Sequence, residues 1–169
     1  MSTLESTIIN PIEVTLHIPS DDDVETTEDS ITNTSLNVST ILFDPAFTTG
    51  IHRLELLNIK ALWGVGIADE SVIYNQNESP AARGQDKIVY YKWECLNMDS
   101  DPRTLTFFVN GEEQKYFVSN VPDSVRFWAY ILDKGASFKI LKFESLSSPK
   151  AQHEESRALK WGKEWIKDE

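Results

Sequence analysis

The sequence predicts an all-β fold, a bent antiparallel β-sandwich that ends in a short amphipathic helix. Three observations predict it. From Leu36 to Phe143, apolar side chains alternate with polar or small ones in short runs, which is the period of a half-buried strand. Turn residues separate these runs at the spacing typical of a sandwich or barrel. No run in this region has helical periodicity, so a parallel α/β sheet is disfavoured.

The first strand is expected from Pro11 to Ser20. Val14, Leu16 and Ile18 alternate there with polar residues, and Pro19 ends the run. This segment precedes the main series of strands, so we expect it to pack on the sandwich or to flank it.

An acidic stretch follows from Ser20 to Asn33, and it contains few apolar side chains. We expect a solvated loop, because so little of it can be buried. It does not match a calcium-binding EF-hand loop, which needs a central glycine and a terminal glutamate. Phosphorylation of Thr26, Thr27 or Ser30 is left open as an alternative to a purely solubilising role.

Four runs in the main series alternate most clearly, and their apolar residues are expected to face the core. They are Leu54 and Leu56; Trp63, Val65 and Ile67; Leu105, Phe107 and Val109; and Val125, Phe127, Ala129 and Ile131. With the shorter runs they predict about eight to ten strands.

The dipeptide Asn110-Gly111 predicts a tight hairpin, because both residues tolerate the positive φ of a type I′ turn. The runs on either side of it, Thr104–Val109 and Glu113–Ser119, are therefore expected to pair as antiparallel neighbours.

The C-terminal tail, residues 149–169, is expected to be an amphipathic helix. At 100° per residue its apolar side chains fall on one face and its lysines on the other, with Pro149 near the first turn. Docking of this helix on the chain's own sheet is the preferred interpretation, and presentation to a partner is the alternative. The predicted organisation is thus residues 1–35 as a flanking segment, 36–148 as the sandwich and 149–169 as the helix.

Several motifs in this order resemble the SPRY domain, in a divergent form. They are the strand Gly50 to Glu55, the Trp63-Gly-Val65-Gly66-Ile67 strand, the hairpin Thr104 to Gly111, and Arg126 in its Val-Arg-Phe strand. The resemblance covers about Leu36 to Leu146. It departs from the family between Tyr74 and Asp86, where the segment before the family's Gly-Asp turn is shorter than usual. The best match for that turn is Gly84-Gln85-Asp86.

The resemblance implies a concanavalin-like jelly roll of two bent sheets, without a cofactor and without catalytic machinery. It also implies that the chain binds a peptide or a protein surface through loops at one edge of the sandwich. Such domains serve as recognition modules or scaffolds within larger assemblies.

Charge and composition indicate which classes of partner are disfavoured and in which cellular compartment the protein is expected. With 27 acidic and 16 basic side chains the formal net charge is −11, which disfavours nucleic acid and anionic membrane surfaces. No apolar run is long enough to cross a bilayer, and the first residues lack the features of a secretory signal. A single cysteine, Cys95, fits a reducing compartment. We therefore expect a cytoplasmic protein.

An enzyme or a metal site is not expected. His17, His52 and His153 lie in three separate segments without zinc-like spacing, and Cys95 within a strand is typical of a small buried hydrophobic residue. No phosphate-binding glycine loop is present.

The candidate partner-binding residues are exposed aromatic and arginine side chains among polar loop residues, because aromatic and arginine side chains supply most of the energy in protein contacts. Tyr74, Asn75, Gln76 and Arg83 lie in a polar loop, and Arg126, Trp128 and Tyr130 share a strand face opposite Phe127. The alternative for the strand face is that another layer covers it, which would make Trp128 ordinary packing.

The leading hypothesis is a non-catalytic module that recognises a protein or peptide partner. The second is a structural subunit of a multi-protein complex that uses its C-terminal helix. A carbohydrate-binding module is the third, and the missing secretion signal disfavours it.

Overall fold

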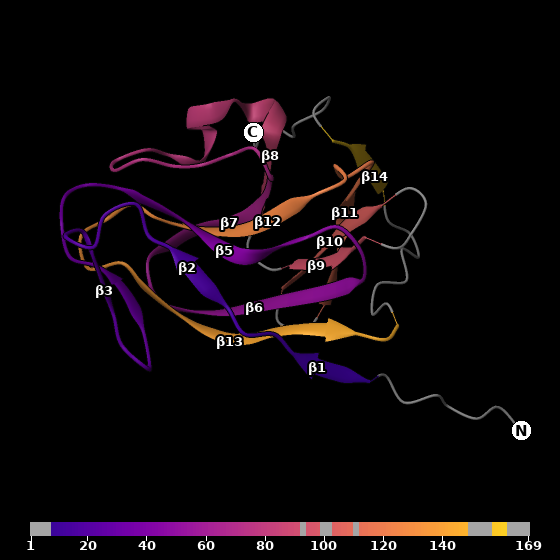
Figure 1. The fold of residues 1–169 in the computed structure, drawn as a ribbon, viewed down its shortest axis with the longest axis horizontal. Coiled ribbons are helices and arrows are strands. Elements are labelled where there is room, and N and C mark those ends of the chain that lie inside the picture. The colour runs from indigo at the N-terminus through magenta and orange to yellow at the C-terminus, as the bar shows by residue number, and fades with distance from the viewer. Residues whose placement is uncertain (1–7, 92–93, 99–102, 110–111, 149–156, 162–169) are drawn as a thin grey trace, which may run out of the picture.

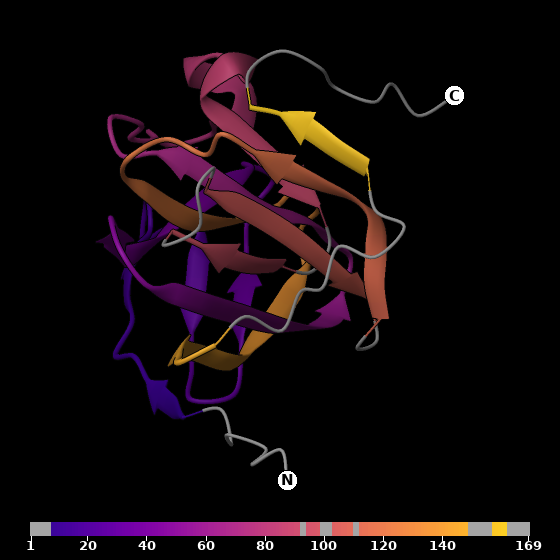
Figure 2. The ribbon, with the colours of Figure 1, turned by 90° about the vertical axis from the view of Figure 1, so that its right-hand side faces the viewer.

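The computed structural model describes residues 8–91, 94–98, 103–109, 112–148 and 157–161, and these form two packed sheets (Figure 1). Sheet A has nine strands and sheet B has five. Seen from the side, the strands of the two sheets form two layers (Figure 2). The all-β sandwich predicted from the alternating runs is confirmed.

Sheet A is the larger layer. Its order is β14 (Arg157–Lys160), β11 (Glu112–Ser119), β10 (Thr104–Val109), β9 (Glu94–Asn97), β6 (Ile51–Lys60), β13 (Ser137–Leu146), β4 (Ile31–Asn33) and β3 (Val24–Thr26), with β1 (Ile9–Pro11) also beside β13. Sheet B has the order β2 (Thr15–His17), β5 (Ser39–Phe47), β12 (Val125–Ile131), β7 (Leu62–Asp69) and β8 (Ile88–Tyr91). The antiparallel pairing predicted for the two sides of Asn110-Gly111 is confirmed by β10 and β11, and the dipeptide itself lies outside the described residues.

The main core lies between the two sheets, as the alternation predicts. Phe43 and Phe127 of sheet B meet Phe138 and Phe143 of sheet A there. The rings of Phe127 and Phe143 pack edge to face with centroids 6.0 Å apart. Burying each such side chain contributes about 1.5–3 kcal/mol.

The N-terminal segment forms two strands rather than the single strand expected. β1 pairs with β13 in sheet A, and β2 pairs with β5 in sheet B. The segment therefore passes from one sheet to the other. Its alternating residues, Val14, Leu16 and Ile18 together with Ile12, pack against the main core.

The expectation of a solvated loop over Ser20–Asn33 is wrong. β3 and β4 form a hairpin within it, and β4 extends sheet A by pairing with β13. The few apolar residues suffice, because Val24 and Ile31 both lie on the core side and are buried. Asp23 is also buried, being only 3% exposed.

The prediction of a C-terminal helix is also wrong where the structure describes the tail. Residues 157–160 are the strand β14, parallel to β11, and Trp161 N–H donates to Ser119 O at 3.0 Å. Leu159 and Trp161 are two residues apart, so an extended backbone places both on the core side. The edge of β11 supplies hydrogen-bond partners to an extended segment that it cannot supply to a helix. Residues 149–156 and 162–169 lie outside the described part.

Trp63 is not in the core, contrary to expectation. The pairing of β7 with β12 is irregular here, with Tyr130 opposite Gly64 and Ile131 opposite Leu62. A bulge of one residue reverses the side on which a side chain lies. Trp63 is 46% exposed and packs edge to face on Tyr130 at 5.2 Å. The side chains of Phe107 and Cys95 lie outside the described part.

A third layer covers the outer face of sheet B. Residues 70–87, which we call the cap, join β7 to β8 and include the short 3₁₀ turns η1 (Pro80–Arg83) and η2 (Gln85–Lys87) (Figure 1). Beneath the cap lies a second core of Leu42, Ala68, Val72, Tyr74, Ile88, Trp128 and Tyr130. Neither 3₁₀ turn, nor any other helix in the described ranges, could span a membrane.

Candidate functional site

One end of the sandwich gathers polar loops, and we call it the loop end. Ile131 of β12 pairs with Ser39 of β5 and with Leu62 of β7, so the loops that flank these residues share this end. The cap starts after Asp69, at the other end of β7, and extends along the sandwich to the loop end. There the side chain of Asn77 accepts a hydrogen bond from Val38 N–H at 3.0 Å. The loop end is defined by residues 34–38, 75–79 and 132–136.

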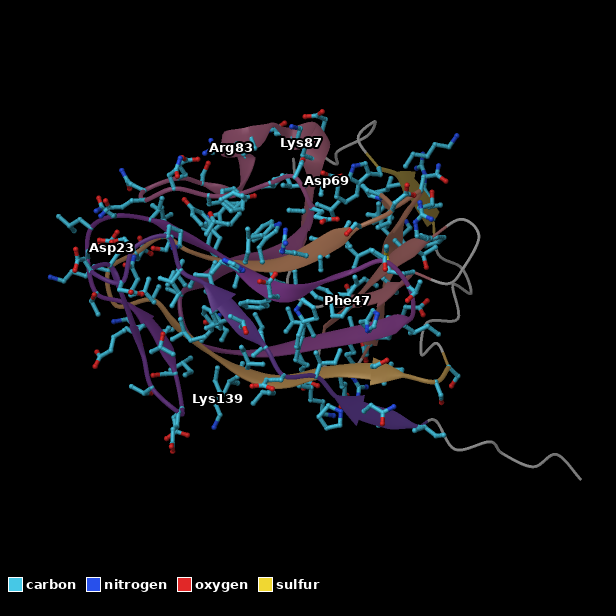
Figure 3. All side chains as sticks on the ribbon, viewed as in Figure 1. Asp23, Phe47, Asp69, Arg83, Lys87 and Lys139 are labelled. Atoms are coloured by element: carbon cyan, nitrogen blue, oxygen red, sulfur yellow. The ribbon has the colours of Figure 1, made fainter. Side chains whose placement is uncertain are left out.

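Asp23 ties the parts of the loop end together. Its carboxylate accepts from Ser35 Oγ at 2.8 Å, from Asn37 Nδ2 at 3.2 Å and from Gln76 Nε2 at 2.9 Å. The hydrogen bonds from Gln76 first and then Ser35 hold the pKa of the Asp23 carboxyl below its ordinary value of 3.8. One buried carboxylate thus links the β3–β4 hairpin, the loop before β5 and the tip of the cap. In Figure 3 Asp23 lies at the edge of the molecule that the cap points toward.

A buried amide, that of Asn33, completes the loop end. Asn33 Nδ2 lies 3.0 Å from Asn37 O, 3.2 Å from Asp133 O and 3.4 Å from Leu132 O. This contact brings the loop before β5 against the loop after β12. The positions of both loops are therefore set by buried side-chain hydrogen bonds rather than by strand pairing.

Arg126 holds the other end of the cap. Its Nε donates to Asp44 Oδ1 at 2.7 Å, and its Nη1 donates to Glu70 O at 2.9 Å. His17 contacts the second oxygen of Asp44. Burial acts to raise the pKa of Asp44, but the hydrogen bonds and charges of His17 and Arg126 outweigh it and hold that pKa below 3.8.

The structure separates the seven site residues predicted from the sequence. Trp128 and Tyr130 are buried in the second core, as the covered-face alternative holds, and Tyr74 joins them with its hydroxyl donating to Pro80 O at 2.7 Å. Burial raises the pKa of the Tyr74 hydroxyl well above its ordinary value. These three residues hold the cap in place.

The other four lie nearer the surface. Arg126 anchors the start of the cap, whereas Asn75, Gln76 and Arg83 lie on its exposed side toward the loop end. Arg83 forms a two-pronged ion pair with Glu78, at 2.9 Å and 2.7 Å. Its position on the cap is visible in Figure 3. The structure thus brings together only Asn75, Gln76 and Arg83 as surface candidates.

Three exposed apolar residues at the loop end are not among the site residues predicted from the sequence. Leu36 is 86% exposed, Trp63 46% and Leu132 38%. Trp63 packs on Tyr130, and Leu132 follows Tyr130 by two positions, just beyond the end of β12. Asn33 Nδ2 donates to Asn37 O and to Leu132 O, so it joins the loop that carries Leu36 to the loop that carries Leu132. We call Leu36, Trp63 and Leu132 the loop-end patch. The exposure of Leu36 could have been predicted, because it is an isolated leucine in the polar run Asn-Thr-Ser-Leu-Asn. The exposure of Trp63 could not, because the sequence does not reveal the bulge that causes it.

The exposed side chains of this end are mostly apolar, amide and basic. The described residues contain no group of three His, Cys, Asp or Glu side chains that could hold a metal ion. Tryptophan and arginine are side-chain types that are prominent in protein contacts, and this end presents Trp63 and Arg83 beside two exposed leucines.

The acid sensitivity of the cap gives a first prediction. The pKa of Asp23 is lower in the folded chain than the 3.8 of an ordinary carboxyl, so its contribution to stability is complete above about pH 4 and is lost as the pH falls through the folded-state pKa. We expect the amides of Ala82 and Gly84 to exchange about tenfold faster in Asp23→Asn at pH 6, because Ser35, Asn37 and Gln76 lose a charged acceptor for their hydrogen bonds. Hydrogen exchange by mass spectrometry measures this.

Asp44→Asn is the matched control for the other end of the cap. It should accelerate exchange near Glu70 more than near Gln76, because Asp44 positions Arg126 on Glu70 O. Unchanged protection of the cap in Asp23→Asn would contradict the tethering role of Asp23.

Comparisons with known proteins bear on the fold. No protein-family model and no curated protein matches the chain. Among solved structures, the crystal structure of the SPRY domain of human HERC1 matches with a TM-score of 0.50 at 12% sequence identity, covering 75% of this chain and 98% of that one. The resemblance drawn from the motifs is confirmed at the level of the fold, which is a divergent SPRY-like sandwich. At this identity the likeness concerns fold alone.

Proposed function

We propose that this SPRY-like sandwich is a non-catalytic, cytoplasmic interaction module that binds a peptide or a protein surface at its loop end. The anchors are Leu36, Trp63 and Leu132, and the polar rim is supplied by Asn75, Gln76 and Arg83. The observation that carries the proposal is the exposure of Trp63 and Leu36 beside loops held by buried hydrogen bonds.

Preorganisation supports this site over a flexible loop. A binding surface loses less conformational entropy when its loops are already fixed. Asp23 and Asn33 fix both loops that border the patch, and Thr40 Oγ1 donates to Glu78 O at 2.9 Å to fix the tip of the cap. The rim can therefore present its side chains in one arrangement.

The two other hypotheses have less support. The structural-subunit hypothesis relied on a C-terminal helix, and residues 157–160 form a strand instead. The carbohydrate-binding hypothesis relied on exposed aromatics of a lectin-like sandwich, and Trp63 alone does not distinguish it from a protein-binding site. A glycan array tests it directly.

The experiment that tests the proposal is comparative affinity capture from native lysate. The bait variants are wild type and Trp63→Ala with Leu36→Ser, and bound proteins are identified by mass spectrometry. Truncating a central anchor weakens a complex by about 1–2 kcal/mol or more, roughly tenfold in affinity. We expect the double variant to lose proteins that the wild type retains.

Leu141→Ser is the matched control. Leu141 is 45% exposed, close to Trp63 in exposure, but it lies on β13 in sheet A. The control should retain the same proteins as the wild type. Equal retention by all three baits, with all three folded by circular dichroism, would remove the loop end as the binding site.

A further inference from the structure

Two links between the sheets lie side by side at the loop end. Ala61, with φ 52°, is the whole link between β6 in sheet A and β7 in sheet B. Residues 132–136 link β12 in sheet B to β13 in sheet A. The last residue of β6 pairs with the first of β13, and the first of β7 pairs with the last of β12, so the two links are neighbours. We call residues 60–63 and 132–136 the corner.

Backbone hydrogen bonds fix the turn within the second link. Ala136 N–H donates to Asp133 O at 3.0 Å, and Gly135 N–H donates to Asn33 O at 2.7 Å. The ammonium group of Lys60 lies over this turn, 3.6 Å from the position that a Cβ atom on Gly135 would occupy. The corner therefore brings a basic side chain of β6 to the turn that follows β12.

Two lysines of the corner have no carboxylate partner in the part of the chain that the structure describes. Lys60 and Lys134 are both exposed, and neither forms an ion pair there. The two lysines of β13, by contrast, each pair with a carboxylate. Asp133 is exposed in the same turn and offsets one of the two positive charges, which leaves an excess of one. This local excess contrasts with the net charge of −11 for the whole chain.

The other charged groups of the loop end lie near the cap. Asp21 and Asp22 directly precede Asp23, whose carboxylate contacts the tip of the cap. Arg83 already pairs with Glu78 at 2.7 Å, so a partner's carboxylate would have to compete with that ion pair. The lysines of the corner are the basic groups that a carboxylate can approach without this competition.

The corner also carries two of the apolar anchors. Lys134 follows Leu132 by two residues, and Lys60 precedes Trp63 by three. A partner's carboxylate can therefore pair with an ammonium group while a neighbouring apolar side chain contacts Trp63 or Leu132. Complementary charge beside an apolar contact contributes mainly to the choice of partner, because a like charge placed there is repelled.

We propose that the partner of the loop end places an aspartate or glutamate against Lys60 and Lys134, next to the apolar side chain that contacts Trp63 and Leu132. The inference rests on the proposed function, since it names the chemistry of the segment that the loop end binds. It predicts the opposite of what net charge predicts, because a chain of net charge −11 attracts basic peptides in general.

A phage-displayed library of random peptides tests this chemistry. The immobilised baits are the full wild-type chain, Lys60→Gln with Lys134→Gln, and Trp63→Ala with Leu36→Ser, each checked for folding by circular dichroism. We expect the wild type to select peptides in which an acidic residue lies beside an apolar one. The lysine variant should still select apolar peptides but should lose the preference for acidic residues.

Lys87→Gln with Lys160→Gln is the matched control. It removes the same charge from two other exposed lysines that form no ion pair within the described residues, one on η2 and one on β14. This control should select the same acidic and apolar peptides as the wild type, because it leaves the corner unchanged.

A synthetic copy of a selected peptide measures the size of the effect. Replacing its acidic residues with the corresponding amides should weaken binding to the wild type about fivefold by fluorescence anisotropy, and should leave binding to the lysine variant unchanged. Selected peptides that depend on Trp63 and Leu36 but show no acidic preference would overturn this inference and leave the proposed function standing. If no selected peptide depends on Trp63 and Leu36, the proposed function fails and the inference fails with it.

Discussion

Gly66→Ala is expected to lower the free energy of unfolding by about 3 kcal/mol, which is the upper range for overpacking a core. A Cβ atom at this position would overlap the carbonyl oxygen of Val89 and would lie 2.5 Å and 2.7 Å from two atoms of the Trp128 ring. Both neighbours are fixed, because β8 pairs with β7 here and Trp128 is fully buried. Neither can move without opening the second core.

Gly135→Ala is the control that separates crowding from backbone strain. Gly135 has φ +90°, but the nearest atom to its Cβ position is Lys60 Nζ at 3.6 Å, an ordinary contact. Its cost should be about 1–2 kcal/mol, from backbone conformation alone. Urea denaturation followed by circular dichroism measures both variants. A smaller loss for Gly66→Ala than for Gly135→Ala would contradict the close packing of β7, β8 and Trp128.

Trp128→Ala should also destabilise strongly, by about 3–5 kcal/mol, because it removes the largest side chain of the second core. Trp128 is 0% exposed, whereas Trp63 on the same side of sheet B is 46% exposed. We therefore expect Trp63→Ala to cost about 1 kcal/mol or less. The same urea titration compares the two variants.

The two tryptophan variants also differ in what they should do to binding. If Trp128 is a core residue and Trp63 a contact residue, Trp128→Ala affects binding only through loss of folding, whereas Trp63→Ala affects binding in a folded chain. Equal destabilisation by the two changes would show that the cap does not bury Trp128 in solution, and the face of β12 would return as a contact surface.

The covered face of β12 shows why the candidate site could be predicted only in part. Alternation correctly places Trp128 and Tyr130 opposite Phe127, on the outer side of sheet B. Whether that side faces water depends on residues 70–87, which fold over it through Val72, Tyr74 and Ala81. Alternation within one strand carries no information about a distant segment that covers it.

The predictions for the acidic stretch and the tail fail for a related reason. Val24 and Ile31 are two apolar residues in a polar run, and they become a hairpin because β13 has an edge on which they can pair. Leu159 and Trp161, being two residues apart, share one face of a strand, although the longer apolar pattern of the tail is helical in period. Sequence period favours the helix, but the available edge of β11 decides for the strand.

What could be determined from the amino-acid sequence alone is the sandwich itself. Alternating apolar residues from Leu36 to Phe143 require two-sided strands, and the motifs between Gly50 and Arg126 place them in a SPRY-like order. Only the tertiary structure decided what covers the outer face of sheet B, which side of β7 Trp63 occupies, and which edge receives the tail. Side-chain period is a local property of a strand, whereas burial, bulges and edge pairing depend on segments far away in the chain.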